Sequence, residues 1–432
     1  MQKMNYLRYT ARQERHYMKL SEELSWRGFT NQTTLPDLEV LDRQKFTLYF
    51  GVDPSSDSMQ VGNLAAAMMV RHFLAYGHKV FLLVGGATGM IGDPGGKSQE
   101  RNLQTIEQIE HNKQAIAAQY ETIFAGQDFT VVDNYDWLSK LTLLDFLRDT
   151  GKHFSMTNLL QRDFIASRIG VGGRGISYTE FSYTLLQGYD YYHLNQNHGV
   201  NLQVCGSDQW GNSISGVELI RRKTGNEAHV YSCPLVINKA TGKKFGKSEA
   251  GTVWLDSTKT SAYQFYQFWL NSDDDGVCDY LRYFTMLTKQ EIEKIEIDFN
   301  QKPSERHAQK TLAYEVTKLV HGSAKADAIR RVAEILFGSK RYQELTKTDF
   351  ELLAGELVHA EATVGEDLIL LLARTSLASS NSDAKRLIQN GGVYVNQDQA
   401  KPGAVLSGND VIAGYVILRV GKNQQAIVSV KP

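Results

Sequence analysis

The stretch Tyr49-Phe-Gly-Val-Asp-Pro-Ser-Ser-Asp-Ser-Met-Gln-Val-Gly-Asn-Leu64 connects a short apolar segment to a helix candidate. The apolar residues 45–50 predict a strand that ends at Gly51. The segment from Leu64 to Tyr76 is rich in Ala, Met and Leu and predicts a helix. The apolar run from Val80 to Val84 then predicts a fully buried strand. A strand, a helix and a second strand in this order are typical of a parallel sheet.

Other segments continue this alternation. Further strand candidates are Phe129–Val132, Leu202–Cys205 and Val230–Val236, and residues 4–28 have a helical pattern. We therefore predict an α/β fold, with a Rossmann-like, mostly parallel sheet wrapped by helices. In such sheets ligands bind beyond the carboxyl ends of the strands. Gly51 and the glycine-rich segment Gly85–Gly92, which we predict to be a turn, both fall at such ends.

The pattern of the chain changes after about residue 258. We expect the sheet domain with its N-terminal helices over 1–238 and a mobile loop over 239–258. Helix periodicity dominates over 259–337 and predicts a separate helical domain. The polar segment 338–365 is predicted to be a linker with short helices, and 366–432 a small α+β domain.

The composition narrows the class of protein. The 432 residues include 47 Lys and Arg against 48 Asp and Glu, so the formal net charge is −1 and any contact with nucleic acid must come from local patches. Three cysteines without close spacing argue against a disulfide framework or a zinc site, and we predict no protein-bound metal. The N-terminus lacks the apolar core of a signal peptide, and no apolar run approaches the roughly 20 residues of a membrane helix. We therefore expect a cytoplasmic protein.

The segment Ile91-Gly-Asp-Pro-Gly-Gly-Lys97-Ser98 nearly spells a phosphate-binding P-loop. That motif requires Gly, four residues and then Gly-Lys-Ser, but Ile91 stands where the first Gly is needed. Asp93-Pro94 would also place a carboxylate and a missing N–H where a phosphate needs donors. We therefore reject the P-loop, and a glycine-rich turn without a ligand stays open as an alternative to a substrate-binding role.

Tyr183, Gln187 and Asp190 are separated by four and three residues, so they fall on one face of a predicted helix. A tyrosine, an amide and a carboxylate on one face meet either solvent or a ligand, and the spacing alone favours neither. The stretch Gly206-Ser-Asp208-Gln209 follows a predicted strand. A capped turn is the alternative to a ligand site there.

A second short stretch, Lys244-Phe-Gly-Lys-Ser248, lies among glycines. By itself it is either a solvated basic turn or a mobile loop that brings two ammonium groups over a leaving phosphate. Together and in this order, Tyr49–Leu64 and Lys244–Ser248 resemble the two signature sequences of class I aminoacyl-tRNA synthetases. Their flanking residues are similar to those of bacterial-type tyrosyl-tRNA synthetases. The similarity extends over essentially the whole chain.

The chain departs from that family within the first signature. The family's usual His-x-Gly-His is here Gln60-Val61-Gly62-Asn63. In the family's reaction a carboxylate attacks the α-phosphorus of ATP without proton abstraction, so positioning and electrostatics carry the catalysis. Amides can donate hydrogen bonds to a phosphate as neutral imidazoles do. Phe50 is a further departure, because many relatives have Cys there, near the ribose.

The resemblance implies that the protein makes tyrosyl-adenylate from tyrosine and ATP with Mg²⁺ and passes the tyrosyl group to the terminal ribose of tRNA. Tyrosine-binding roles are implied for Tyr49, Asp93, Tyr183, Gln187, Asp190 and Gln209, of which Tyr49 and Asp190 face the phenol oxygen. ATP contacts are implied for Gly51, Asp53, Gly62, Gly206 and Asp208. Catalytic roles, chiefly toward the phosphates, are implied for Gln60, Asn63, Lys97, Arg101, Lys244, Lys247 and Ser248.

The resemblance also implies partners. Residues 382–396 are similar to the small alpha-L RNA-binding fold, so we expect RNA contacts at Lys385 and Arg386, with 259–337 binding the anticodon. Arg221 and Arg222 form another basic patch, for which an acceptor-stem contact and compensation of a helix dipole are equal alternatives. The family implies a homodimer that binds tRNA(Tyr).

Two other functions remain alternatives to tyrosyl-tRNA synthesis. An RNA-binding paralogue that has lost catalysis is suggested by Gln60 and Asn63, and opposed by the intact second signature and the complete tyrosine pocket. A tryptophanyl-tRNA synthetase is disfavoured by Tyr49 together with Asp190, because an indole presents no hydroxyl group.

Overall fold

The computed structural model describes residues 18–93, 104–170, 173, 175–242, 244–248, 251–337, 341–421 and 424–431. The chain folds into two compact units. The first comprises Met1–Thr260 and Phe268–Val320, and the second Ser261–Gln267 and His321–Pro432. Among the described helices, none combines the length and the apolar character needed to cross a bilayer.

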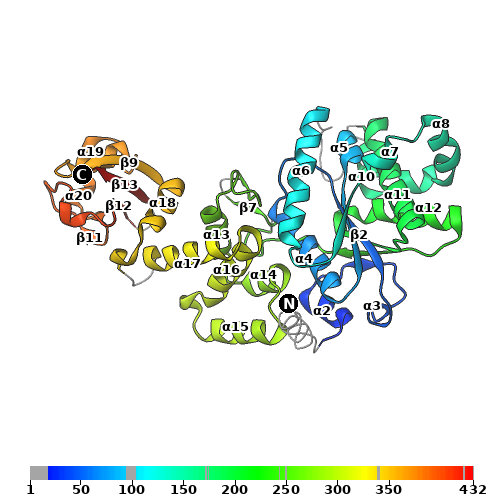
Figure 1. The fold of residues 1–432 in the computed structure, drawn as a ribbon, viewed down its shortest axis with the longest axis horizontal. Helices are drawn as coiled ribbons and strands as arrows, with labels where there is room; N and C mark the ends of the chain where they lie inside the picture. The colour runs from blue at the N-terminus through cyan, green and yellow to red at the C-terminus, as the bar shows by residue number, and fades with distance from the viewer. Residues whose placement is uncertain are drawn as a thin grey trace, which may run out of the picture. The chain divides into compact units, whose positions relative to one another are not determined.

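The first unit is built around a sheet whose described strands lie in the order β1-β6-β5-β2-β3-β4 (Figure 1). The strands are β1 (Gln32–Thr33), β2 (Thr47–Val52), β3 (Lys79–Val84), β4 (Phe129–Asp133), β5 (Leu202–Gly206) and β6 (His229–Cys233). Neighbours from β6 to β4 run parallel, and β1 pairs with β6 in the antiparallel sense. In β3 every residue after Lys79 is buried, as expected for a strand covered on both faces. The predicted Rossmann-like α/β sheet is confirmed.

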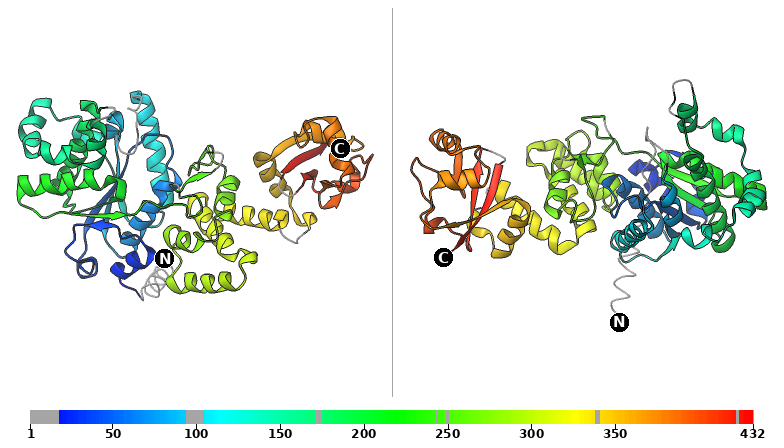
Figure 2. Two further views of the ribbon diagram at one scale, coloured as in Figure 1. Left: turned by 180° about the vertical axis from the view of Figure 1, so that it is seen from behind. Right: turned by 90° about the horizontal axis from the view of Figure 1, so that it is seen from above.

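Helices cover both faces of this sheet. Helices α4 (Val61–Ala75) and α6 (Ile106–Ile123) lie on one face, and α11 (Tyr178–His198) and α12 (Trp210–Thr224) on the other, as the ribbon views show (Figures 1 and 2). Helix α11 begins at a capping box in which the Ser177 side chain accepts a hydrogen bond from the Glu180 N–H, and it ends at Gly199 in the left-handed conformation. These local signals determine where the helix that carries Tyr183, Gln187 and Asp190 begins and ends.

Shorter helices complete the first unit. Those between β1 and α11 are α3 (Val40–Arg43), α5 (Gly86–Ile91), α7 (Tyr135–Leu138), α8 (Leu143–Asp145), α9 (Met156–Leu160) and α10 (Asp163–Ile169). Of the predicted helical segment 4–28, residues 20–27 form α2 (Leu20–Arg27), and residues 1–17 lie outside the described part. Two strand bounds are corrected: Gly51 lies inside β2, and the strand predicted over Val230–Val236 ends at Cys233.

The segment Gly85–Gly92 was predicted to be a turn, and this prediction is wrong, because it contains α5. Glycines disfavour a helix, but the first N–H groups of α5 find partners at the end of β4. The N–H of Gly86 donates to Asp133 Oδ1 (3.1 Å) and that of Ala87 to Asn134 Oδ1 (2.7 Å). Side chains from a distant part of the chain thus cap this helix, and the local sequence does not reveal them.

The helices predicted over 259–337 are present, as α13 (Ala262–Leu270), α14 (Val277–Phe284), α15 (Lys289–Gln301), α16 (His307–His321) and α17 (Ser323–Phe337). However, α14 and α15 belong to the first compact unit rather than to a unit of their own. Arg27 of α2 connects to this region, since its Nη1 donates to the carbonyls of Arg282 (2.8 Å) and Thr285 (3.0 Å).

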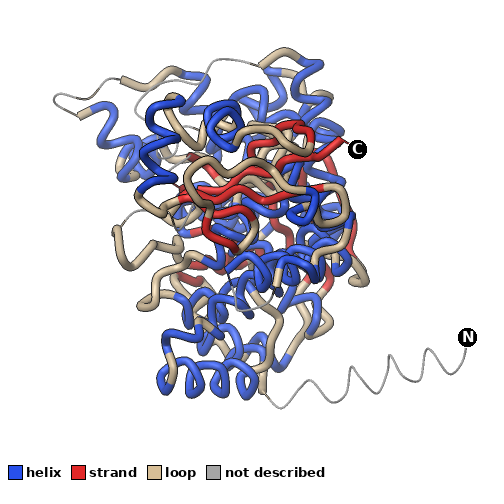
Figure 3. The backbone as a smooth tube through the Cα atoms, turned by 90° about the vertical axis from the view of Figure 1, so that its left-hand side faces the viewer, coloured by secondary structure: helices blue, strands red, loops and turns tan. Residues whose placement is uncertain are grey.

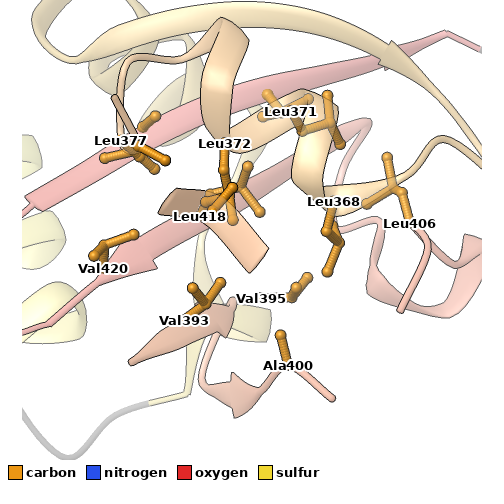
Figure 4. Packing of buried hydrophobic residues seen from close by; sticks show 14 of the residues in the cluster. Leu368, Leu371, Leu372, Leu377, Val393, Val395, Ala400, Leu406, Leu418 and Val420 are labelled. Carbon is orange, nitrogen blue, oxygen red and sulfur yellow. The ribbon is translucent and has the colours of Figure 1, made fainter. Parts of the chain in front are cut away.

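The second unit contains a small sheet in the order β11-β10-β12-β13-β9. After α17, its described α-helices and strands are α18 (Lys347–Glu356), β9 (Val358–Thr363), α19 (Leu368–Arg374), α20 (Asn381–Gln389), β10 (Val393–Val395), β11 (Asp398–Gln399), β12 (Tyr415–Val420) and β13 (Gln424–Lys431). Figure 3 shows these strands as red tubes beside blue helices. Leu368, Leu371 and Leu372 of α19 pack on Leu418 and Val420 of β12 (Figure 4). Strand β9 pairs in parallel with β13, so residues 358–363 of the predicted linker 338–365 are part of this sheet.

Candidate active site

A cavity of about 270 Å³ lies at the carboxyl ends of β2 and β5, beside the N-terminus of α4. This is the position in the sheet where the strand order reverses, and ligands of open parallel sheets bind there. The predicted site residues that line it are Tyr49, Gly51, Asp53, Gln60, Gly62, Asn63, Asp93, Tyr183, Gln187, Asp190, Gly206, Asp208, Gln209 and Lys244. Lys97 and Arg101 lie outside the described residues. Lys247–Ser248 form strand β7, which pairs with β8 (Gly251–Thr252).

Asp190 of α11 is a buried carboxyl group in this cavity, only 2% exposed. Its Oδ1 accepts a hydrogen bond from Trp137 Nε1 (2.8 Å) and its Oδ2 one from Asn134 Nδ2 (2.9 Å). Burial raises the pKa of this carboxyl to about 8, although the two donors oppose the shift. The charge of Asp190 near neutral pH therefore depends on what binds beside it.

Tyr49 and Gln187 each bring a buried polar atom to the cavity. Within the described part of the chain, neither Tyr49 Oη nor Gln187 Oε1 has a hydrogen-bond partner. Burial, and next the charge of Asp190, raises the pKa of the Tyr49 hydroxyl, so this group keeps its proton and can donate it to a ligand. A buried polar atom without a partner costs about 1–3 kcal/mol. These two atoms therefore indicate a polar ligand.

A second carboxylate, Asp53, lies just after β2. Tyr183 Oη donates to its Oδ2 (2.8 Å), and Thr88 Oγ1 donates to its Oδ1 (2.7 Å). Asn134 Nδ2, which donates to Asp190, also donates to Thr88 Oγ1 (2.9 Å). A continuous chain of hydrogen bonds thus connects Asp53 with Asp190, and Asn134, which is fully buried, holds its centre.

The remaining acidic groups favour a ligand with a positive charge. Asp93 Oδ2 accepts a hydrogen bond from Gln209 Nε2 (2.6 Å), and Gln209 Oε1 accepts one from Asn212 Nδ2 (3.0 Å). Among the described lining residues, the carboxyl groups are those of Asp53, Asp93, Asp190 and Asp208, whereas Lys244 brings an ammonium group. An ammonium group of a ligand would be well placed beside Asp93 and Tyr183.

Gly85 and Gly86 allow α5 to approach these side chains closely. A Cβ atom at Gly85 would lie 2.1 Å from Asp53 Oδ1 and 2.4 Å from Thr88 Oγ1. A Cβ atom at Gly86 would lie 2.3 Å from Asp133 Oδ1. Neither glycine has a left-handed φ angle, so it is the close approach of neighbouring atoms, not the backbone conformation, that requires glycine at both positions.

The two signature stretches contact each other at the start of α4. The Gln60 N–H donates to Asn63 Oδ1 (3.0 Å), so the Asn63 side chain caps the helix through its oxygen and presents its NH₂ group as a donor. Gly246 lies against Gly62, since a Cβ atom at Gly246 would come within 3.2 Å of the Gly62 nitrogen. The Val61 N–H donates to the Val253 carbonyl (3.1 Å), and the Val253 N–H donates to the Gly246 carbonyl (3.0 Å), so Val253 connects the second stretch to this helix.

Phe245 anchors the loop that contains Lys244. Its ring is buried and packs on Tyr280 and Phe284, with ring centroids 4.4 and 5.7 Å away. Lys244 itself pairs with Asp208 at 3.6 Å, and the two side chains are 57% and 46% exposed. An ion pair this exposed contributes at most about 1 kcal/mol. The Lys244 ammonium can therefore leave Asp208 at little cost while Phe245 holds the loop.

The predicted RNA contacts are not among the described residues that line the cavity. Arg221 and Arg222 lie in the last turn of α12, where Arg222 Nη1 donates to the His153 carbonyl (2.9 Å). Lys385 and Arg386 are exposed on α20, and Arg386 pairs with Asp383 (2.7 Å).

Sequence reasoning missed three residues that shape the site: Thr88, Asn134 and Trp137. Asn134 follows directly after β4, so its place at the carboxyl end of a predicted strand was a usable signal. Trp137 offered no such signal, because it lies 53 residues from Asp190 and nothing in the sequence relates the two.

Comparison with protein families agrees with this geometry. The family model described as tRNA synthetases class I (W and Y) matches residues 41–338, and the S4 domain model matches residues 368–412. The chain is 44% identical over 421 residues to a tyrosine–tRNA ligase of Staphylococcus haemolyticus, covering 95% of this chain and 99% of that protein. It is 43% identical over 423 residues to a tyrosine–tRNA ligase of Bacillus caldotenax, covering 95% and 99%.

Solved structures show the same fold. A C-terminally truncated mitochondrial tyrosyl-tRNA synthetase of Aspergillus nidulans superposes with a TM-score of 0.66 at 31% identity, over 74% of this chain and 94% of that one. A tryptophanyl-tRNA synthetase of Encephalitozoon cuniculi, bound to tryptophan, gives a TM-score of 0.53 at 13% identity, over 77% of this chain and 91% of that one. At that identity the second likeness concerns the fold alone.

Proposed function

The chain belongs to the class I tRNA synthetases, among the tyrosine–tRNA ligases, and we propose that the cavity beside Asp190 is where it makes tyrosyl-adenylate from tyrosine and ATP. The observation that carries this assignment is the pair of buried atoms Tyr49 Oη and Gln187 Oε1, which lack partners among the described residues, next to the carboxyl of Asp190. A tyrosine molecule offers a phenol and an ammonium group that satisfy such atoms.

The phenol end of the substrate lies between Tyr49 and Asp190 in this proposal. Its hydroxyl accepts a hydrogen bond from Tyr49 and donates one to Asp190, and its ammonium group lies near Asp93, Tyr183 and Gln187. Phenylalanine would leave the Tyr49 and Asp190 groups buried without partners, which is strongly unfavourable. Tyrosyl-tRNA synthetases are the known example of this rejection, at about 10⁵-fold without editing, a magnitude that belongs to that class of enzymes.

ATP lies toward the N-terminus of α4. Backbone contacts at Gly51, Gly62 and Gly206 bind the nucleotide, and Asp208 binds the ribose. Asp53, assigned to ATP from the sequence, accepts the hydrogen bonds of Tyr183 and Thr88, so we propose that it also orients Tyr183 toward tyrosine. We propose that Mg²⁺ arrives with the ATP phosphates, because this ion is typically held by substrate phosphates and few carboxylates.

The chemical step forms a bond between a tyrosine carboxylate oxygen and the α-phosphorus, and pyrophosphate leaves with the electron pair of the broken P–O bond. Gln60 and Asn63 donate hydrogen bonds to the phosphates from the N-terminus of α4, which itself favours anions. Lys97, Arg101, Lys244, Lys247 and Ser248 complete the proposed set and stabilise charge on pyrophosphate. Lys244 is exposed, as a side chain that moves onto a leaving group needs to be.

Transfer of the tyrosyl group to tRNA needs RNA contacts beyond the cavity. The S4 domain match supports Lys385 and Arg386 as contacts to tRNA(Tyr), and both side chains are exposed on one helix. Arg221 and Arg222 are proposed for the acceptor stem, and 259–337 for the anticodon. A cytoplasmic location is part of the proposal, and the described cysteines, which are free thiols, agree with a reducing compartment.

A homodimer is also proposed, and exposed apolar side chains support it. Between β4 and α11, Leu143 is 70% exposed, Leu144 77% and Met156 55%. We infer an interaction surface from several exposed apolar side chains within one segment of the chain. We call this segment, residues 143–169, the apolar segment.

The experiment that tests the function is tyrosine-dependent exchange of pyrophosphate into ATP, with phenylalanine and tryptophan as control substrates. Exchange with tyrosine alone is expected. Absence of exchange in a folded protein that still binds tRNA would overturn the assignment and favour the RNA-binding paralogue that Gln60 and Asn63 suggest.

A further inference from the structure

Trp137 is held at two points by one helix. Its indole Nε1 donates to Asp190 Oδ1 (2.8 Å), and its ring lies flat on the imidazole of His193, with centroids 4.4 Å apart and planes 12° apart. Asp190 and His193 are three residues apart on α11, so they lie on the same side of this helix. Asp190 contacts the edge of the indole and His193 contacts its flat side.

The helix that carries Trp137 gives it little support of its own. Helix α7 has four residues, and its neighbour Tyr135 is 42% exposed, yet Trp137 is only 9% exposed. The position of the indole therefore depends on what packs against it. Trp137 belongs to a buried apolar cluster, and the His193 ring is stacked on its indole.

Both stacked rings border a second cavity, of about 560 Å³. Asp190 lines the first cavity and not this one, so the indole of Trp137 stands between the Asp190 carboxyl and the second cavity. Removing the His193 ring would expose the outer face of the indole to this space, let the ring tilt, and weaken its hydrogen bond to Asp190.

We propose that His193 is a positioning residue for the tyrosine site, whose ring fixes Trp137 so that Nε1 stays on Asp190. This inference rests on the proposed function, because it assigns Asp190 to the phenol of tyrosine. Its consequence is that His193, which lies outside the lining of the first cavity, affects both the affinity for tyrosine and the discrimination against phenylalanine.

The stack of His193 on Trp137 is a contact between an uncharged imidazole and an indole. Burial, followed by the charges of His198 and Lys140, lowers the pKa of His193. Asn197 of the same helix lies with its Nδ2 3.3 Å from this Nδ1. The other charged groups among the described residues around the second cavity are Glu110 and Lys113 of α6, Asp133 of β4 and Asp136 of α7. Because stacking rather than charge is the interaction, a phenyl ring can replace the imidazole.

The test compares His193→Ala with His193→Phe in pyrophosphate exchange. Stacked aromatic pairs contribute about 0.5–1.5 kcal/mol. His193→Ala should therefore raise the KM for tyrosine roughly 2- to 10-fold and lower the tyrosine-to-phenylalanine preference by a similar factor, with kcat and the KM for ATP unchanged. His193→Phe should restore both values. His198→Ala is the matched control, since it removes a histidine from the same helix and cavity whose ring lies on Phe81 instead (5.0 Å).

A second readout does not depend on activity. The emission of Trp137, obtained by difference against Trp137→Phe, should shift in His193→Ala and not in His198→Ala. An unchanged KM and emission in His193→Ala would overturn the proposal, and so would equal losses in His193→Ala and His193→Phe. If the wild-type protein showed no exchange, the proposed function would fail, whereas the emission would still decide whether His193 positions Trp137.

Discussion

Among single side chains, Asp190 couples the site to the stability of the fold. Burial raises the pKa of this carboxyl from its ordinary value of 3.8 to about 8 in the folded chain. Between these values the folded state binds a proton that the unfolded state releases. The stabilising effect is therefore complete below about pH 4 and is lost as the pH rises through about 8.

The variant Asp190→Asn should reveal this coupling. It carries no titrating group, so wild-type stability should fall relative to the variant between pH 5 and pH 9, by an order of a few kcal/mol. Thermal unfolding of both proteins at pH 5, 7 and 9 measures the difference. A gap in melting temperature that does not change with pH would show that Asp190 is ionised throughout. The same variant should lose tyrosine activation, because one acceptor for the phenol is gone.

Gln60 stands where the family usually has histidine, and its contribution is separable from substrate binding. If it donates a hydrogen bond to ATP phosphate in the transition state, Gln60→Ala should slow adenylate formation roughly 10-fold or more, with the affinity for tyrosine intact. Single-turnover adenylate formation and equilibrium tyrosine binding separate the two quantities. Gln60→His is the matched control and should retain most of the rate. A near-wild-type rate for Gln60→Ala would assign the phosphate contact to another residue.

Among helices and strands, α5 shows how a backbone element adjusts a side-chain network. Gly85→Ala would drive a Cβ atom into Asp53 and Thr88, and so displace the partner of the Tyr183 hydroxyl. We expect a loss of about 1–3 kcal/mol in stability and a raised KM for tyrosine. Denaturant unfolding and pyrophosphate exchange measure the two effects.

A matched glycine controls this prediction. Gly355 of α18 has open space around its Cβ position and no left-handed φ, so Gly355→Ala should be neutral or slightly stabilising. Equal effects of the two substitutions would show that the close approach at Gly85 is not what matters.

Strands of the parallel sheet were predictable where an uninterrupted apolar run has clear ends, as in β3, where Val80–Val84 lies between Lys79 and Gly85. The helix α5 was not, because Asp133 and Asn134 cap it from 47 residues away and its own sequence is glycine-rich. The same limit applies to the site. The spacing of Tyr183, Gln187 and Asp190 predicted that they share a helix face, and the family resemblance supplied their ligand roles. Trp137 and His193, in contrast, meet only in the folded chain.

For the chain as a whole, the proposed homodimer predicts that the apolar segment forms its interface. Replacing both Leu143 and Leu144 with Asp places charges on this surface, and each buried leucine contributes about 1.5–3 kcal/mol to an interface. We expect the double variant to be monomeric at concentrations where the wild type is a dimer, with dimer affinity reduced roughly 100-fold or more. Light scattering after size exclusion measures this.

Leu370→Asp is the control for the dimer prediction, because Leu370 is a 51% exposed leucine in the second unit. It should leave the oligomeric state unchanged. A wild type that is monomeric, or a double variant that remains dimeric, would contradict the assignment of the interface to the apolar segment.

The order of the strands in the first unit has a consequence for refolding. Strands β2, β3 and β4 are neighbours in the sheet and are consecutive strands in the chain. The pairing of β2 with β5, which we call the β2–β5 seam, instead brings Thr47 next to Asn201, 154 residues away. Closing so long a loop is slow, so this seam should form after the β2–β3–β4 half. Tyr49 lies on one side of the seam and Gln203 on the other. A refolding chain should therefore regain its circular dichroism before it can bind tyrosine, and added tyrosine should leave the early phases unchanged.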